Sequence, residues 1–223
     1  CKDIGLDYLT VYAFSTENWK RPQEEVGAIM GLLRKYLHEA IEEMARDHIK
    51  LEFFGDLTSL DPELYQLCQE TRKISEGYTG FQVNVCLNYG GRDEIVRAAR
   101  KFAQDCLEGK AKPEELTETA FANDLYSAGI PDPELIIRPS GEIRTSNFLL
   151  WQGAYAELYF SDKMFPDFSD KDLDEALIAY ATRTRRFGKT DEQCLVNDDS
   201  SEKDFKKEES TETNTQSTEE KGE

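Results

Sequence analysis

Short apolar segments that suit β-strands alternate along this chain with segments whose apolar residues recur at helical spacing. Residues 9–14 are β-branched and aromatic, and from Gln23 to about Arg46 apolar residues recur every three or four positions. Further strand-like segments at 49–53 and 81–87 each precede another helical pattern. Because parallel strands are usually joined through a crossover helix, the alternation predicts an α/β fold, with a mostly parallel central sheet and helices on both faces.

The remaining elements follow from caps, turn residues and periodicity. Asp61-Pro62 is expected to open a helix that runs to Ser75, and Pro22 suits the first helical position of the long helix. The other predicted elements are helices over about 93–108, 117–126 and 170–183, a short buried strand at 135–137 and a turn at 165–168.

Charge divides the chain into a body and a tail. The 223 residues carry a net charge of −18; residues 191–223 hold 12 acids and 4 lysines, a net of −8, which leaves −10 for the rest. We expect one domain over 1–189 and an acidic, disordered tail over 190–223. A segment with so few apolar residues cannot bury enough surface to offset the conformational entropy that it would lose on folding. The acidic body argues against nucleic acid as a partner, so anion binding requires locally gathered arginines.

Cysteine and histidine usage does not indicate a metal or disulfide framework. The five cysteines are widely spaced and contain no Cys-x-x-Cys pair, so they are expected to be free thiols of a reducing compartment. His38 and His48 have no metal-like partner nearby in the sequence and are interpreted as structural. No run of 18 apolar residues suggests a transmembrane helix.

Polar chemistry gathers after the strand at 135–137. Arg138 should emerge at the strand's carboxyl end, where open α/β sheets place ligands, and Arg144, Ser146 and Glu157 follow closely. Guanidinium groups and a hydroxyl suit phosphate oxygens, while a carboxylate suits a hard cation, so a diphosphate–magnesium site is one interpretation. The alternative is that the arginines pair with local acids such as Glu142 on a solvated loop.

A second polar segment joins the first strand to the long helix. It contains Asn18, Trp19 and Arg21 within residues 12–22. On a generic loop the tryptophan would serve packing and the asparagine would form a cap or turn.

A third segment, at residues 88–93, places the Gly90-Gly91 pair between a strand and a helix. Such a turn resembles a phosphate-cradling loop, but on generic grounds paired glycines more often form a tight turn without a ligand.

Together the segments at 12–22 and 138–160 resemble the two hallmark motifs of the cis-prenyltransferases, the family of undecaprenyl and dehydrodolichyl diphosphate synthases. The resemblance covers about residues 8–188. The Asn-Trp-x-Arg-Pro loop between a strand and a helix is specific, and so is the segment at 138–160, called the Arg-rich segment below. Where the family usually has threonine, this chain has Pro139, which cannot donate a backbone N–H.

The resemblance implies a role for each candidate residue. It assigns catalysis to Ser15, Asn18 and Arg21, substrate binding to Trp19, Arg92, Arg138, Arg144 and Ser146, and the metal to Glu157, with Asp93 in a supporting position.

The implied reaction condenses isopentenyl diphosphate with an allylic diphosphate of farnesyl type to a cis-polyprenyl diphosphate, as in polyprenol or dolichol biosynthesis. The resemblance also implies Mg²⁺ as cofactor and an apolar tunnel for the product, as in undecaprenyl diphosphate synthase. It implies a homodimer, or a heterodimer with a related subunit, in which the segment 183–188 completes the partner subunit's site; the alternative for this segment is a basic helix end facing its own dipole. The expected location is the cytoplasm or plastid stroma, soluble or peripheral to a membrane.

One motif of the family is absent from the 223 residues. The family begins with a strand ending in Asp-Gly-Asn-Gly-Arg, whose aspartate binds Mg²⁺, and no such segment occurs here. The chain begins at Cys1 with no visible targeting segment, so we expect a domain that lacks its first strand and loop and has little activity as given. The alternative function is a non-catalytic partner that stabilises a cis-prenyltransferase.

Overall fold

The computed structural model describes residues 1–183, and the predicted tail at 190–223 lies outside this part. The chain divides into two compact units, residues 1–166 and residues 167–223, of which 167–183 are described. The first unit contains β1 (Tyr8–Ser15), α1 (Gln23–Asp47), β2 (Lys50–Phe54), α2 (Pro62–Ser75), β3 (Gln82–Tyr89), α3 (Gly91–Leu107), α4 (Glu118–Ala122), β4 (Leu135–Arg138) and β5 (Glu157–Phe160).

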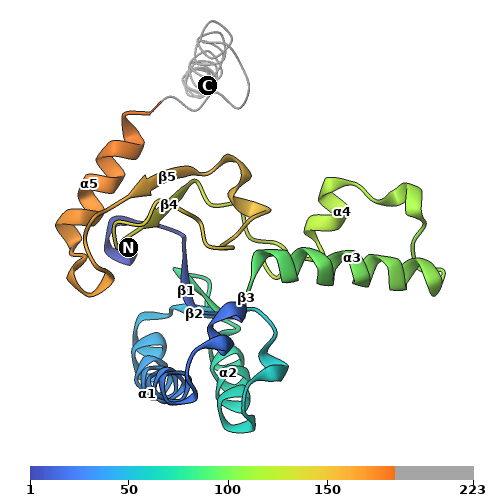
Figure 1. Cartoon of the computed structure of the whole chain (residues 1–223), viewed down its shortest axis with the longest axis horizontal. Helices are drawn as coiled ribbons and strands as arrows, with labels where there is room; N and C mark the ends of the chain where they lie inside the picture. The colour runs from blue at the N-terminus through green and yellow to red at the C-terminus, as the bar shows by residue number, and fades with distance from the viewer. Residues whose placement is uncertain (184–223) are drawn as a thin grey trace, which may run out of the picture. The chain divides into compact units, whose positions relative to one another are not determined.

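All the strand pairs of the first unit are parallel, which confirms the α/β class (Figure 1). The strands form two sheets, of order β1-β3-β2 and β4-β5, where a single central sheet was predicted. Strand β5 was not predicted. It has only four residues, and the long segment before it shows no helical periodicity that would mark the end of one element and the start of another. Strand β5 pairs with β4 without a crossover α-helix between them.

An irregularity in β1 turns neighbouring aromatic side chains to opposite faces of the sheet. Tyr12 lies opposite Cys86 and Phe14 lies opposite Leu87, so the extra residue Ala13 shifts the register. Tyr12 therefore belongs to one apolar cluster and the fully buried Phe14 to another.

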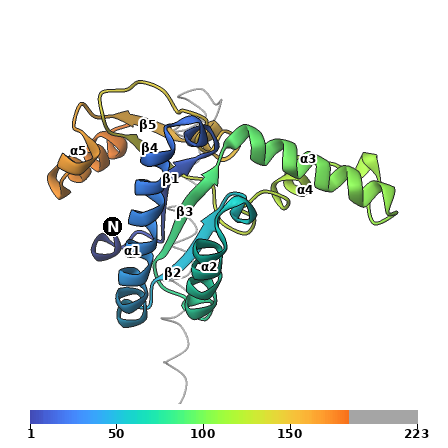
Figure 2. The same cartoon turned by 60° about the horizontal axis from the view of Figure 1, so that its bottom comes forward.

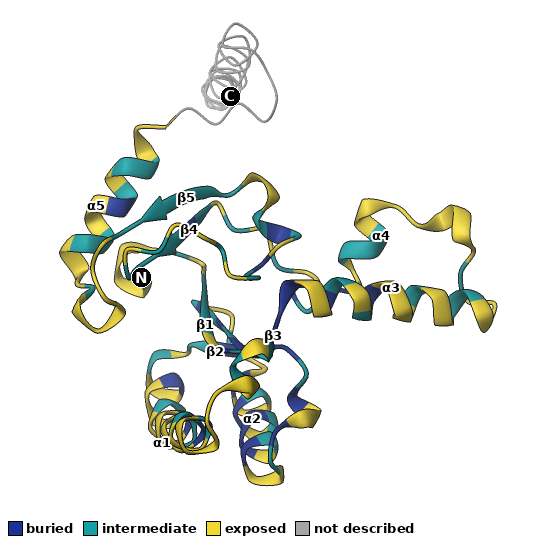
Figure 3. Cartoon of the chain, viewed as in Figure 1, coloured by how far each residue is buried: buried dark blue, intermediate teal, exposed yellow. Residues whose placement is uncertain are grey.

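One face of the three-stranded sheet is covered by α1 and α2, which lie side by side (Figures 1 and 2). The helical spacing in α1 brings Met30, Leu37 and Met44 into this core, together with Leu64 of α2 and Phe53 of β2. Burial of these side chains is the main favourable term for this half of the fold (Figure 3).

The apolar cluster that holds Tyr12 and Cys86 is completed by non-helical segments rather than by a helix. Leu149 and Phe148 come from the long segment before β5, and Tyr126 and Ile130 come from the turns after α4. The packing therefore ties the Arg-rich segment to the carboxyl half of β3.

Helix ends agree with the predicted caps in some cases and differ in others. Helix α2 begins at Pro62 as predicted, and the Asp61 carboxylate accepts a hydrogen bond from Leu64 N at 3.1 Å. Pro22 is the N-cap residue of α1 rather than its first helical residue. Helix α3 begins at Gly91, two residues earlier than predicted, and α4 is only five residues long and ends at Ala122.

The second unit contains α5 (Asp170–Ala181), in the place predicted from its apolar spacing. The Ser169 N–H donates to the carboxylate of Asp172 at 2.9 Å, so the helix begins with a capping box. None of the helices within residues 1–183 is both long and apolar enough to cross a bilayer.

Candidate functional site: two arginine-bearing loops around one cavity

The loop after β1 is a short 3₁₀ helix, Thr16–Lys20, held by its own side chains. The Ser15 N–H donates to Asn18 Oδ1 at 2.8 Å as part of a capping box. The capping role considered for Asn18 is thus present in the structure. Arg21 follows the 3₁₀ helix and pairs with Glu25 at 2.7 Å.

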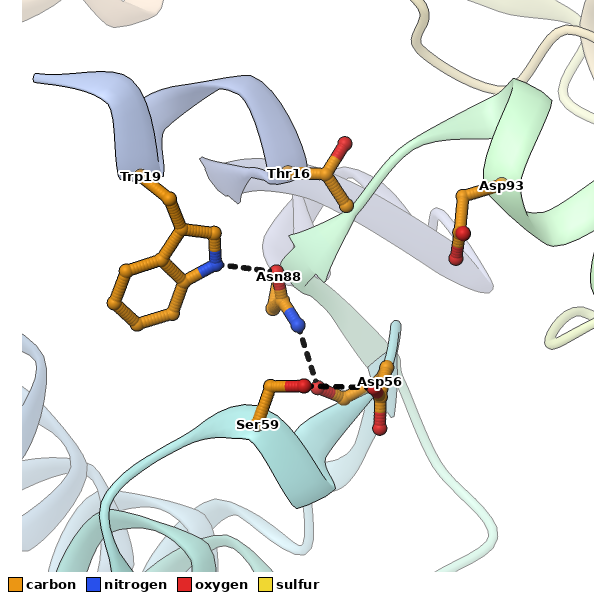
Figure 4. A pocket seen from close by; sticks show the side chains of 6 residues that line it. All are labelled: Thr16, Trp19, Asp56, Ser59, Asn88 and Asp93. Atoms are coloured by element: carbon orange, nitrogen blue, oxygen red, sulfur yellow. Dashed lines mark hydrogen bonds between the residues drawn. The ribbon is translucent and has the colours of Figure 1, made fainter.

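Trp19 is anchored across the strands although 39% of its surface remains exposed. Its indole N–H donates to Asn88 Oδ1 at 2.7 Å, and Asn88 Nδ2 donates to the carbonyl of Asp56 at 2.7 Å (Figure 4). The ring also packs edge-on against Phe14, with 5.0 Å between centroids. These contacts place Trp19 in the wall of an open cavity of about 440 Å³, together with Thr16, Asp56, Ser59, Asn88 and Asp93 (Figure 4).

The segment after β4 turns sharply several times before it reaches β5. Ser140, Gly141, Ser146, Asn147 and Leu149 all have positive φ. The start of the segment is fixed by Ser140 N and Gly141 N, which donate to the carbonyls of Lys163 and Ser161 at 2.6 and 2.9 Å. Arg144 forms an ion pair with Glu142, so the local pairing considered for it occurs on the exposed loop.

A cavity of about 610 Å³ lies between these two loops. Its lining brings together six of the residues predicted from sequence: Ser15, Asn18, Arg21, Arg138, Arg144 and Ser146. It also includes Tyr12, Phe14, Glu17 and Asn147, none of which was predicted as a site residue. Three arginines thus line one cavity in a chain whose net charge is −18.

The other predicted site residues lie apart from this cavity. Trp19 and Asp93 line the 440 Å³ cavity instead. Arg92 lies in the first turn of α3, where its backbone N–H donates to Asn147 Oδ1 at 2.8 Å. Glu157 is the first residue of β5 and lies opposite Leu135, at the end of the β4–β5 pair away from Arg138.

Asn147 is the residue that sequence reasoning missed most clearly. Its Nδ2 donates to Glu17 Oε1 at 2.9 Å, its Oδ1 accepts from Arg92 N, and its carbonyl accepts from Gly91 N at 2.8 Å. The sequence carried no direct signal for it, because the helix was expected to begin only at Asp93, where Gly91 and Arg92 need no cap.

Two ionisable groups of the cavity have shifted pKa values. Burial raises the pKa of the Tyr12 hydroxyl, and the nearby Glu17 carboxylate raises it further. For Glu17 itself, burial acts to raise the pKa, but hydrogen bonds from its own backbone, Asn147 and Thr16 outweigh that effect and hold the pKa below its usual value. Glu17 is therefore an anion among the arginines at neutral pH.

A buried carboxylate of α3 helps to fix the position of the Arg-rich segment. Glu94 of α3 is fully buried and accepts hydrogen bonds from the Tyr89 hydroxyl at 2.7 Å and from Tyr126 N at 2.8 Å. Gln152 Nε2 reaches the same carboxylate at 3.2 Å. This network fixes the end of the Arg-rich segment to α3, since a buried carboxylate is costly unless its oxygens are satisfied.

Within residues 1–183, no group of three His, Cys, Asp or Glu side chains gathers in a way that could hold a metal ion. Mg²⁺ commonly takes only one or two protein carboxylates and completes its shell with phosphate oxygens and water. Glu157, the carboxylate predicted to bind the metal, does not line the cavity that contains the three arginines, so the described residues do not bring it beside a diphosphate bound there.

Comparison with known proteins places this chain in a family. A family model described as "Putative undecaprenyl diphosphate synthase" matches residues 1–188. An isoprenyl transferase of Prochlorococcus marinus is 47% identical over 191 residues, which cover 86% of this chain and 72% of the relative. The chain belongs to the cis-prenyltransferase family. An isoprenyl transferase of Geobacter sulfurreducens is 44% identical over 193 residues, covering 86% of this chain and 78% of that one.

Solved structures of cis-prenyltransferases agree with the fold. Lavandulyl diphosphate synthase from Lavandula x intermedia, in complex with dimethylallyl diphosphate, superposes with a TM-score of 0.81 at 35% identity, covering 84% of this chain and 81% of that one. A probable undecaprenyl diphosphate synthase from Campylobacter jejuni gives a TM-score of 0.76 at 35% identity, covering 85% and 86%. The predicted family and the α/β fold are thus confirmed.

Proposed function

We propose that the chain condenses isopentenyl diphosphate with an allylic diphosphate to give a cis-polyprenyl diphosphate of the polyprenol or dolichol type. The observation that carries the proposal is the shared cavity: Arg21 comes from one loop, and Arg138 and Arg144 come from another more than a hundred residues later. Guanidinium groups bind diphosphate oxygens through charge-assisted, often bidentate, hydrogen bonds.

The reaction requires a site that handles charge while keeping two substrates aligned. The bond between C1 of the allylic substrate and its diphosphate breaks, C4 of isopentenyl diphosphate bonds to that carbon, and C2 loses a proton. Arg138, Arg144 and Ser146 are proposed to hold the isopentenyl diphosphate group, which fixes the alkene near the allylic carbon. Arg21 and Asn18, with Ser15 beside them, are proposed to orient the second diphosphate and the departing proton.

Trp19 and Arg92 are proposed to act at the edges of this arrangement. The indole face of Trp19 offers an apolar surface for an allylic chain, and its N–H is already bound to Asn88. An apolar surface would shield a cationic allylic fragment from water. The apolar tunnel for the product remains a prediction.

Mg²⁺ is proposed as cofactor, which would neutralise charge on the departing diphosphate through phosphate oxygens and water. Glu157, which the family motif assigns to the metal, lies at the end of the β4–β5 pair away from Arg138 and outside the cavity that the arginines line. If Mg²⁺ is the cofactor, chelation of divalent cations should abolish turnover but leave the folded state unchanged.

The proposal is tested by titrating the full chain with isopentenyl diphosphate in a calorimeter. Arg138→Gln and Arg144→Gln should each weaken binding by roughly 10- to 100-fold, the effect of losing a charge-assisted hydrogen bond. Arg100→Gln is the matched control, since this exposed arginine of α3 lies outside both cavities. Equal losses in all three variants would contradict the site.

A second candidate is a non-catalytic partner that stabilises an active cis-prenyltransferase subunit. The two candidates differ in the Asp-Gly-Asn-Gly-Arg motif, which a catalytic subunit would contain and a non-catalytic partner would have in substituted form. Product formation by the purified chain would support the enzyme, while stimulation of a related synthase without turnover of its own would support the partner. The homodimer or heterodimer also remains a proposal, to be measured by the mass of the species in solution.

A further inference from the structure

The start of α3 is closed by a residue that lies far away in the sequence. Helix α3 has Gly90 as its N-cap residue and no side-chain cap of its own. Its first backbone N–H groups are instead occupied by Asn147, whose carbonyl accepts from Gly91 N and whose Oδ1 accepts from Arg92 N, both at 2.8 Å. An N-terminal helix turn needs such acceptors, because its N–H groups have no partner within the helix.

This arrangement explains the glycine pair at 90 and 91. A Cβ atom at Gly90 would lie 2.8 Å from Asn147 Nδ2, and one at Gly91 would lie 3.0 Å from the Asn147 carbonyl and 2.8 Å from Leu150 Cγ. The space that a phosphate would need is therefore filled by the Arg-rich segment. The Gly90-Gly91 turn serves close packing, and the N–H groups of Gly91 and Arg92 are not available to a ligand.

The remaining hydrogen-bonding group of Asn147 points to the other loop of the cavity. Its Nδ2 donates to Glu17 Oε1 at 2.9 Å, while Glu17 Oε2 accepts from the Thr16 hydroxyl at 3.2 Å. Asn147 itself has φ +65° and follows Ser146 at φ +50°, so the segment bends to bring one side chain between two partners.

We infer that Asn147 is a positioning residue, which sets the spacing between the Arg21 loop and the Arg138–Ser146 loop by capping α3 and holding Glu17 with the same amide. The functional meaning rests on the proposed diphosphate chemistry, because that spacing determines how far apart two diphosphates are held. The amide is required for both tasks, since one end must accept and the other must donate.

The donor and acceptor requirement allows a charge-swap experiment. Asn147→Asp keeps an acceptor for Arg92 N, which a carboxylate at a helix N-terminus serves well, but it places a carboxylate against Glu17. Glu17→Gln alone keeps an acceptor for Asn147 Nδ2. In the double variant Asn147→Asp/Glu17→Gln, the new amide at position 17 can donate to the new carboxylate at position 147. The hydrogen bond between the two positions then forms again with donor and acceptor exchanged.

Two measurements on the full chain report on the hydrogen bond between residues 147 and 17. In Asn147→Asp we expect amide hydrogen exchange of residues 16–21 to quicken by about 10-fold, with a melting temperature within about 2 °C of the parent because the cap is kept. Isopentenyl diphosphate affinity should fall by about 10-fold and return to within about twofold in the double variant. Asn147→Ala should lose the cap as well and melt about 3 °C lower.

The outcomes separate this inference from the proposed function. Unchanged exchange of residues 16–21 in Asn147→Asp, or a double variant no better than the single one, would overturn the role of Asn147. If the parent chain fails to bind isopentenyl diphosphate, the proposed function fails, while the exchange measurement still decides whether the two loops are tied. Restoration of exchange and of affinity in the double variant would support both.

Discussion

At the scale of single residues, many side chains of the candidate site already have protein partners. Arg21 pairs with Glu25, Arg144 pairs with Glu142, and Asn18 caps the loop that contains it. The two ion pairs are exposed, where such pairs contribute little to stability and exchange readily. Bound diphosphate, with a higher charge density than a single carboxylate, can therefore compete for these guanidinium groups.

Thiol reactivity should divide the cysteines by burial. Cys68 and Cys86 are fully buried; burial raises the pKa of the Cys68 thiol to about 12 and raises that of Cys86 as well. Alkylation of the native chain with iodoacetamide at pH 8 should therefore modify Cys106 and leave Cys68 and Cys86 unmodified until the chain unfolds. Peptide mass spectrometry after a short pulse checks this, and early modification of Cys86 would contradict the described packing.

At the scale of elements, the Asp61 carboxylate both links α2 to α1 through an ion pair and caps the start of α2. Arg34 of α1 reaches the Asp61 carboxylate at 2.6 Å, and the same carboxylate accepts from Leu64 N at the start of α2. The hydrogen bond from Arg34 lowers the pKa of Asp61. Because the folded-state pKa is the lower one, this contribution to stability is present above the unfolded pKa and is lost as the pH falls through the folded value.

Two substitutions at Asp61 separate the cap from the ion pair. Asp61→Asn keeps an acceptor for Leu64 N, whereas Asp61→Ala removes the cap and should lower the free energy of unfolding by about a further 1 kcal/mol. Urea unfolding at pH 7 measures both. The difference between the parent and Asp61→Asn should shrink as the pH falls from the unfolded pKa of Asp61, about 4, through its lower folded pKa, because the unfolded chain takes up the proton first. A difference that is constant down to pH 2 would contradict the linkage.

At the scale of the whole molecule, stability depends on the cluster between the three-stranded sheet and the helices α1 and α2. Leu64 lies at its centre with 0% exposure, whereas Leu107, at the end of α3, is 83% exposed. Leu64→Ala should lower the free energy of unfolding by about 2 to 5 kcal/mol, and Leu107→Ala should change it by less than about 0.5 kcal/mol. Thermal and urea unfolding of the two variants compare the same chemical change inside and outside the core.

The patterns of local residues predicted the elements well where local forces decide. The positions of α1, α2 and β3 followed from apolar spacing and from caps such as Asp61-Pro62, because these signals act within a few residues. The two loops that carry Arg21 and Arg138 were also recognisable, since their motifs are contiguous. Family membership followed from these contiguous segments and is confirmed by the comparisons.

Only the tertiary structure decided which of these residues share a cavity. The short strand β5, the division into two sheets and the register shift at Ala13 depend on pairing between distant segments, for which a single sequence carries no direct signal. The same holds for Asn147: an asparagine after a serine looks like an ordinary turn residue. It becomes a cap for α3 and a partner for Glu17 only because the chain brings together residues separated by 55 and 130 positions.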